Sequence, residues 1–299
     1  MTNKNKPTIV WFQAITCNGN THSLLSANSA RLELFLNSFN LIYHPSLTVD
    51  KSLEDILSQK EKIDYLLVEG AISSNSDIFA LSNDNTNNIL NKLSSKSNHI
   101  IAVGSCAAYG GIHAKFEQHK DVSGIKDNIK HKTLKNLKHE IINLNGCPVH
   151  PEWILQTLFT LEAYGKIQID DEGRPIELYS TLAHHGCTRN EYFEWKIEGA
   201  FGEKEGCLFY DQGCRGPMTK SSCNKILWND VSSKTRAGMP CIGCTESDFP
   251  RSNMLETKKN IGIPLEVPLG ISKRAYLSIT GIAKTFKIDR LNKKLMDNK

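Results

Sequence analysis

The chain has 299 residues, 39% of them hydrophobic and 23% charged, which is typical of a globular protein with one large or two medium domains. Its formal net charge of only +4 argues against a nucleic-acid-binding protein. No apolar run approaches the roughly 20 residues of a membrane span, and the N-terminus lacks a signal peptide's apolar core, so we expect a cytoplasmic protein without a transmembrane segment.

Strands and helices alternate in the first half of the chain. β-branched and aromatic runs predict buried strands, at residues 8–15, 65–68, 99–103 and 140–144. Helices are expected after these strands. Apolar residues have helical spacing in residues 24–35, a helix is expected to begin at Pro151 and run to residue 164, and the polar residues 82–95 are expected to form a loop and a surface helix. This alternation predicts an α/β fold with a doubly wound parallel sheet.

A polar stretch at residues 166–180 interrupts this pattern. We place a domain boundary there, with residues 1–170 in the α/β domain and residues 171–299 in a second domain. The second domain has few long apolar runs, which predicts a small, irregular core supported by metal. A terminal helix is expected near residues 274–286, followed by a solvated basic tail.

Four chemically active side chains follow the predicted strands. They are Cys17, Glu69, Cys106 and Cys147, and the three cysteines lie in glycine-containing loops. Ligands of doubly wound sheets bind beyond the carboxyl ends of the strands. The pattern therefore predicts a shared site at this edge of the sheet.

Six more cysteines and a histidine occur within about sixty residues of the second domain. They are His184, Cys187, Cys207, Cys214, Cys223, Cys241 and Cys244. Nine cysteines in a reducing compartment favour metal or redox chemistry over disulfides. Thiolates suit both iron–sulfur clusters and zinc. A closed tetrad could form from His184 and the first three cysteines for either metal, whereas the last three thiols match a three-iron cluster better than zinc.

These residues resemble the small, electron-transferring subunit of nickel–iron hydrogenases. The resemblance covers nearly the whole chain and rests on motifs in a fixed order. They are Val68-Glu-Gly-Ala-Ile72, Val103-Gly-Ser-Cys-Ala-Ala-Tyr-Gly-Gly-Ile112, Asn145-Gly-Cys-Pro148 with His150-Pro151, His184-x2-Cys187, Gly206-Cys207, Gly213-Cys-Arg-Gly-Pro217 and Pro240-Cys-Ile-Gly-Cys244. The family fold would be a flavodoxin-like parallel sheet followed by an irregular, cluster-binding C-terminal domain.

The resemblance also implies the ligands of three iron–sulfur clusters. Cys17, Cys106 and Cys147 would hold a proximal 4Fe-4S or 3Fe-4S cluster. A distal 4Fe-4S cluster would be bound by His184, Cys187, Cys207 and Cys214, where His184 fits the family's HxxC spacing better than His185. A medial 3Fe-4S or 4Fe-4S cluster would be bound by Cys223, Cys241 and Cys244.

The proximal motif departs from the family pattern. The family has cysteine where this chain has Asn20, and a glutamate where it has His22. Three outcomes are open for the cluster: a three-iron cluster, a four-iron cluster with an oxygen donor from Asn20 or from elsewhere, or water at the fourth site. Asn20 would otherwise be a turn residue without a bond to iron. Fewer thiolates raise a cluster's reduction potential, and a subgroup of oxygen-tolerant members is similar in carrying aspartate here.

We therefore expect an electron-relay subunit of a nickel–iron hydrogenase (H2:acceptor oxidoreductase). The resemblance implies a large partner subunit with the Ni-Fe centre, a heterodimer that forms a dimer of heterodimers or a larger assembly, and an acceptor near His184. Association with a membrane would be peripheral, through partners. Glu69 would orient a loop near the proximal cluster or face the large subunit. The alternatives are a subunit of a regulatory H2-sensing hydrogenase and, without enzymatic function, a zinc-scaffolded interaction protein.

Overall fold

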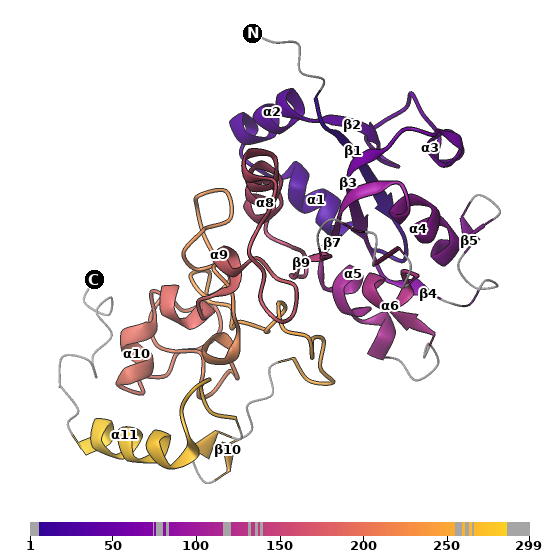
Figure 1. The fold of residues 1–299 in the computed structure, drawn as a ribbon. Coiled ribbons are helices and arrows are strands. Elements are labelled where there is room, and N and C mark those ends of the chain that lie inside the picture. The colour runs from indigo at the N-terminus through magenta and orange to yellow at the C-terminus, as the bar shows by residue number, and fades with distance from the viewer. Residues whose placement is uncertain are drawn as a thin grey trace. The chain divides into compact units, whose positions relative to one another are not determined.

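The computed structural model describes residues 6–73, 75, 80–81, 84–115, 121–130, 133–134, 137, 140–254, 259–260, 263–264 and 266–285 (Figure 1). Contacts divide the chain into two compact units, Met1–Glu177 and Leu178–Lys299. The expected boundary after residue 170 lies a few residues before this division. The expected basic tail lies almost entirely outside the described residues.

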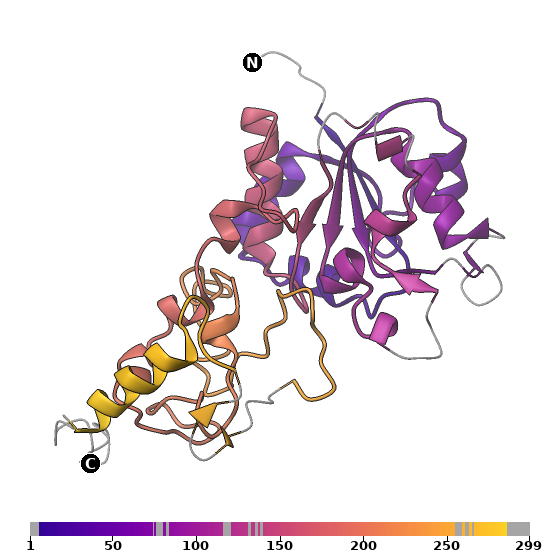
Figure 2. The same ribbon diagram turned by 60° about the horizontal axis from the view of Figure 1, so that its bottom comes forward.

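The first unit is organised around a five-stranded sheet. Its strands are β1 (Thr8–Gln13), β2 (Asn40–Tyr43), β3 (Ile63–Glu69), β7 (Ser97–Val103) and β9 (Ile142–Leu144). They are ordered β2-β1-β3-β7-β9, and every neighbouring pair is parallel (Figure 2). This is the flavodoxin-like order of a doubly wound sheet. The predicted fold class is thus confirmed.

Several helices and short strands complete the first unit. The helices are α1 (Gly19–Leu25), α2 (Ser29–Ser38), α3 (Leu53–Ser58), α4 (Thr86–Ser94), α5 (Ser105–Tyr109), α6 (Ile125–Asn128) and α8 (Pro151–Tyr164), with a 3-10 turn η1 (His113–Lys115). The short helix α9 (Ile176–Tyr179) includes the point of division between the units. The short strands are β4 (Ile72–Ser73), β5 (Ala80–Leu81), β6 (Asp84–Asn85) and β8 (Val122–Ser123). Strand β2 was not predicted, because four partly exposed residues at a sheet edge carry no clear apolar pattern.

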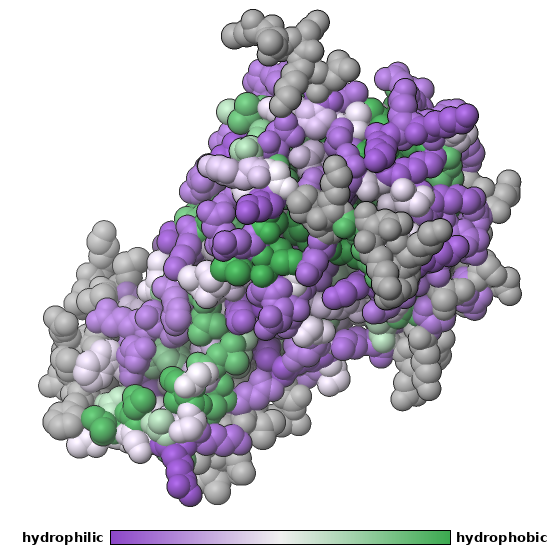
Figure 3. All heavy atoms as spheres, in the orientation of Figure 1, coloured by the Kyte–Doolittle hydropathy of each residue, from purple (hydrophilic) through white to green (hydrophobic). Residues whose placement is uncertain are grey.

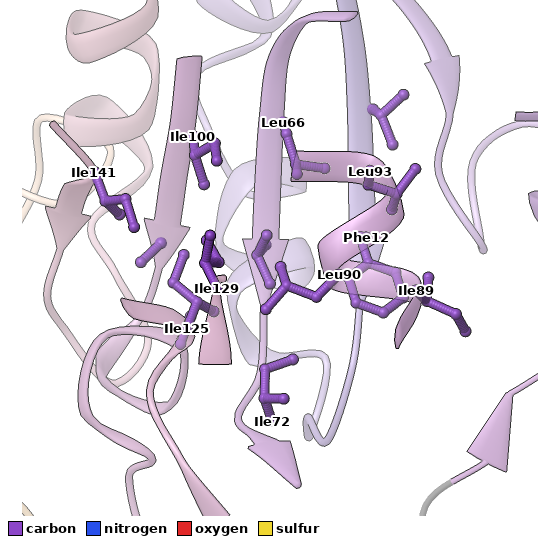
Figure 4. Close-up of a cluster of buried hydrophobic side chains, with 14 of the residues drawn as sticks. Phe12, Leu66, Ile72, Ile89, Leu90, Leu93, Ile100, Ile125, Ile129 and Ile141 are labelled. Carbon is purple, nitrogen blue, oxygen red and sulfur yellow. The ribbon is translucent and has the colours of Figure 1, made fainter. Parts of the chain in front are cut away.

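Alternate residues of each strand pack on opposite faces of the sheet. On one face, Val10, Phe12 and Leu66 join a buried cluster with side chains of α3 and α4. Figure 4 shows Phe12 and Leu66 in this cluster. Helix α4 contributes Ile89, Leu90 and Leu93, so the segment expected to be a surface helix buries one full side against the sheet. On the other face, α1 and α8 lie side by side (Figure 1). Burial on both faces fixes the strand ends, which carry the functional side chains.

The second unit has little regular structure, as predicted. It contains α10 (Asn190–Glu194), α11 (Lys273–Thr285), the 3-10 turns η3 (Ala183–Gly186) and η4 (Gly216–Met218), and the short strands β10 (Lys259–Asn260) and β11 (Ile263–Pro264). Its buried core includes Cys207, Cys214 and Cys241 among aromatic side chains such as Phe193 and Phe209. The cysteines are therefore part of the packing of this unit.

Hydrophilic side chains cover most of the face shown in Figure 3, with apolar side chains in separate patches. Within the described residues, no helix combines the length and the apolar character that a membrane span needs.

Candidate metal centres

All nine cysteines lie in the described residues, and all are reduced thiols. Within the described residues, no three His, Cys, Asp or Glu side chains converge closely enough to hold a single metal ion. The structure instead distributes the thiols over three groups, which we call the first, second and third groups. The first group lies in the sheet unit, and the other two lie in the irregular unit.

The first group consists of Cys17, Cys106 and Cys147. Cys17 lies between β1 and α1, Cys106 in α5 just after β7, and Cys147 in the loop after β9. Burial raises the pKa of the Cys106 thiol, and a nearby Cys17 thiolate adds to this rise. A Cβ atom on Gly19 would lie 3.2 Å from the Sγ of Cys17 and 3.7 Å from Pro148. The three loops therefore meet at one edge of the sheet, as expected.

Glycines keep this edge open for a bulky group. A side chain at Gly111, where φ is +58°, would collide with the Sγ of Cys106. Cys17 and Cys147 are exposed at the same edge. Missing Cβ atoms beside thiols allow the main chain to wrap closely around an inorganic core.

Glu69 holds the Cys17 loop in place. Its carboxylate is fully buried at the end of β3 and accepts six hydrogen bonds. Oε1 accepts hydrogen bonds from the main-chain N–H groups of Asn20, at 3.0 Å, and Thr21. Amides in the first turn of a helix have no acceptor within the helix, so Glu69 supplies one. The other donors are the Thr16 hydroxyl, the Trp11 indole, the Gln13 amide and the Thr21 hydroxyl. This supports the loop-orienting role expected for Glu69.

The two unusual residues of the first motif differ in burial. Asn20 is only 8% exposed, and its side-chain amide forms hydrogen bonds with the main chain at Val103 and Val149. His22 is exposed on α1.

The second group lines a single cavity. His184, Cys187, Cys207 and Cys214 all contribute to its wall. Burial lowers the pKa of His184 to about 4, with a smaller effect from His185, so the imidazole is neutral, as a metal ligand must be. The His184 ring packs edge-on against Phe193 at 4.4 Å. His184, rather than His185, lines the cavity.

Main-chain amides point at all three sulfurs of the second group. The donors are Arg189 N–H to Cys187 Sγ at 3.4 Å, Phe209 N–H to Cys207 Sγ at 3.4 Å, and Cys241 N–H to Cys214 Sγ at 3.1 Å. Burial raises the pKa of Cys207 and raises that of Cys214 to about 11. A thiol that binds a metal releases its proton, and hydrogen bonds to its sulfur would then tune the reduction potential of a cluster.

Arg189 lines the same cavity, and the sequence did not single it out. Its side chain is buried, and its guanidinium donates to the main-chain carbonyls of Thr235, Glu205, Gly206 and Glu203. Its charge lowers the pKa of Cys207, against the larger effect of burial. The only signal in the sequence is an arginine two residues after Cys187.

The third group consists of Cys223, Cys241 and Cys244. Burial is the main cause that raises the pKa of Cys241, and the thiolates of Cys214, Cys223 and Cys244 raise it further. Arg215 N–H donates to the Cys241 carbonyl at 2.8 Å. The Arg215 guanidinium is buried and pairs with Glu266 at 2.7 Å.

The donor sets fit iron–sulfur clusters. Seven donors in the second unit are six soft thiols and one neutral imidazole, and the first group is made of thiols alone. Glycine cradles and N–H groups directed at sulfur accompany them. One cavity brings His184, Cys187, Cys207 and Cys214 together, whereas the ligand sets and the nature of the bound metal stay predictions.

Two family models match the chain in succession. Residues 17–161 match the model of the NADH ubiquinone oxidoreductase 20 Kd subunit. Residues 179–256 match the model of the C-terminal region of the NiFe/NiFeSe hydrogenase small subunit.

Curated relatives cover most of the chain. It is 30% identical over 264 residues to the periplasmic NiFe hydrogenase small subunit 1 of Nitratidesulfovibrio vulgaris (strain Hildenborough), which covers 83% of this chain and 81% of the relative. It is 30% identical over 262 residues to the Hydrogenase-2 small chain of Escherichia coli K12, covering 82% and 68% of the two chains. The first of these names is that of a periplasmic protein, which differs from the cytoplasmic location expected here.

Solved structures agree with these relatives. A reduced, active form of the Ni-Fe-Se hydrogenase of Desulfomicrobium baculatum matches with a TM-score of 0.72 and 27% identity, over 82% of this chain and 96% of that chain. The actinobacterial-type NiFe-hydrogenase of Ralstonia eutropha H16 matches with a TM-score of 0.76 over 99% and 94% of the two chains. At 22% identity, this second likeness shows a shared fold alone.

Proposed function

The chain belongs to the family of NiFe hydrogenase small subunits, and from this we propose that it relays electrons from H2 oxidation at a partner subunit's nickel–iron site to an acceptor. One observation supports the relay most directly. Four expected ligands line one cavity, and one of them, Cys214, accepts a hydrogen bond from Cys241 of the neighbouring thiol group. Adjacent groups of soft donors suit electron transfer from one cluster to the next.

We assign each group one cluster. The first group would hold the proximal cluster through Cys17, Cys106 and Cys147. The second group, His184 with Cys187, Cys207 and Cys214, would hold a distal 4Fe-4S cluster. Cys223, Cys241 and Cys244 would hold a medial cluster, for which three thiolates suit the 3Fe-4S type. When bound, such clusters supply one-electron carriers.

The residues of this chain set the conditions for transfer. Burial in the second unit excludes water from Cys207, Cys214 and Cys241. Arg189 places a buried positive charge at the second group, which favours the reduced form of a cluster there. The charge of Arg215, near the third group, is offset by Glu266. The surroundings therefore favour electron flow towards the second group, near His184.

The exposed edge of the first group suits contact with a large subunit that carries the Ni-Fe centre. Cys17 and Cys147 are exposed there, so a partner could approach the first group directly. The names of the relatives, "small subunit" and "small chain", are consistent with such a partner. A dimer of heterodimers, a cytoplasmic location and peripheral membrane association stay predictions.

The alternatives are less well supported. A regulatory H2 sensor is not favoured by the relatives described above, which are named as hydrogenase subunits. Family membership also favours iron–sulfur clusters over a zinc scaffold.

The test is co-purification of the chain with its large subunit, followed by H2-dependent reduction of a dye. The relay predicts robust dye reduction, and Cys207→Ser should reduce it strongly while the heterodimer still forms. A complex that contains the nickel–iron centre but transfers no electrons to any dye would contradict the relay.

A further inference from the structure

The side chain of Asn20 joins the three loops that carry the first group of cysteines. Its Nδ2 donates to the Val103 carbonyl at 3.1 Å, and its Oδ1 accepts the Val149 N–H at 2.9 Å. Val103 ends β7, three residues before Cys106, and Val149 lies two residues after Cys147. Asn20 itself lies in the first turn of α1, the helix that follows Cys17.

Further contacts hold Asn20 and its side-chain amide in place. Its main-chain N–H donates to Glu69 Oε1 at 3.0 Å, which anchors it to the end of β3. The amide plane lies against Gly104, where a Cβ atom would fall within 2.9 Å of Asn20 Cγ, and φ there is +91°. Val103 and Val149 are fully buried, and Asn20 is 8% exposed. The amide thus occupies a niche that only glycine at position 104 leaves open.

Both ends of the amide are engaged with the main chain. The lone pair of an amide nitrogen is delocalised into the carbonyl and is a poor ligand for iron, and the oxygen already uses one of its two lone pairs for a buried N–H. Releasing that oxygen would leave the Val149 N–H buried without a partner, which is costly. A cysteine at this position would offer only a weak donor and a weak acceptor.

We propose that Asn20 is a positioning residue that clamps the loops of Cys17, Cys106 and Cys147 together, and that it is not a ligand of iron. The inference rests on the proposed cluster at the first group. The ligands supplied by this chain to that cluster are then three thiolates. A fourth thiolate would bind iron at this position. Asn20 instead forms two hydrogen bonds that link the loops.

The test compares the purified heterodimer carrying Asn20→Ala with the wild-type complex. Hydrogen–deuterium exchange at Val149 N–H reports on the clamp, and Mössbauer spectra of isotope-enriched complex report on the iron of the first group. We expect exchange at Val149 to accelerate about tenfold, since one buried hydrogen bond is lost, and the iron spectrum to keep the same sites. A changed iron spectrum, or unchanged exchange at Val149, would overturn the proposal.

Two further variants keep the test decisive. Asn20→Asp retains an oxygen acceptor for Val149 and loses the donor to Val103, so it should restore protection at Val149. Equal loss of protection in both variants would contradict the clamp. Asn28→Ala is the matched control, because it removes an asparagine side-chain hydrogen bond at the start of α2, away from these loops. If the complex contains no iron, the proposed function fails, whereas the exchange experiment still decides whether Asn20 clamps the loops.

Discussion

The main-chain N–H of Cys241 donates a hydrogen bond to the Sγ atom of Cys214, with 3.1 Å between the two atoms. This contact joins the second group of thiols to the third. Cys207 belongs to the same cavity as Cys214, and its sulfur instead accepts the N–H of Phe209. Two cysteines of one group therefore differ in their connection to the next group.

This difference predicts unequal effects of two matched substitutions. Cys207→Ser should remove the distal cluster and leave the medial signal unchanged. Cys214→Ser should remove the distal cluster and also shift the medial signal, because Cys241 loses its sulfur acceptor. Electron paramagnetic resonance of the oxidised complexes measures the medial three-iron signal, and spectra of the H2-reduced complexes measure the distal cluster. Identical medial spectra in the two variants would show that the groups are not coupled through this contact.

Glu69 should be essential for the stability of the first unit. Glu69→Gln places an NH2 group among N–H and O–H donors in either orientation, so buried donors lose their acceptor. Hydrogen bonds to charged groups contribute roughly 1.5–3 kcal/mol each, so we expect a loss of about 2–4 kcal/mol. Thermal unfolding of the complex would show a lower Tm, and Glu33→Gln, on the exposed face of α2, is the control. Equal Tm values for both variants would refute the role of Glu69.

Arg189 should affect both the stability of the second unit and the reduction potential of the distal cluster. Two substitutions separate these effects. Arg189→Lys keeps the charge but cannot reach four carbonyls, so it should lower the Tm and leave the distal potential nearly unchanged. Arg189→Met removes the charge as well, so the distal midpoint potential should also fall, because a nearby cation favours the reduced cluster. Potentiometric titration distinguishes the variants, with exposed Arg236→Met as control. An equal midpoint potential of the distal cluster in the wild type and in Arg189→Met would contradict this role.

His44 should make stability depend on pH. It is fully buried, with Nδ1 accepting the Ser46 N–H and Nε2 beside the Thr21 hydroxyl. Burial lowers its pKa, against a smaller opposite effect of Glu69. The unfolded chain then binds more protons below about pH 6.5, so stability should fall with decreasing pH, by at most about 1.4 kcal/mol per pH unit.

The measurement is the Tm of the complex between about pH 5 and about pH 7.5. His44→Gln should flatten the dependence, while His22→Gln, at an exposed position, should not. Parallel curves for wild type and His44→Gln would exclude His44 as the source.

The sequence was informative where the signal is local. Apolar runs predicted the buried strands β1, β3, β7 and β9, because buried parallel strands are continuous apolar segments. The helix of α8 was predicted at its observed bounds from Pro151 and the apolar spacing that follows. Motif order placed His184, Cys187, Cys207 and Cys214 in one set, and these four residues line one cavity.

Long-range contacts could not be predicted in this way. Asn20 bonds to residues 83 and 129 positions away, and Glu69 to residues about 50 positions away. Such partners are chosen by the tertiary packing of strand ends, which leaves no periodic trace in the sequence. Arg189 was missed for the same reason, since its carbonyl partners are main-chain atoms of other loops.

Metal and sulfide analysis of the purified heterodimer, before and after exposure to H2, tests the electron relay most directly. We predict iron with acid-labile sulfide, no zinc, and paramagnetic signals that change when H2 is admitted. A colourless complex that contains zinc and no sulfide, or a chain that never associates with a nickel-containing subunit, would contradict the relay.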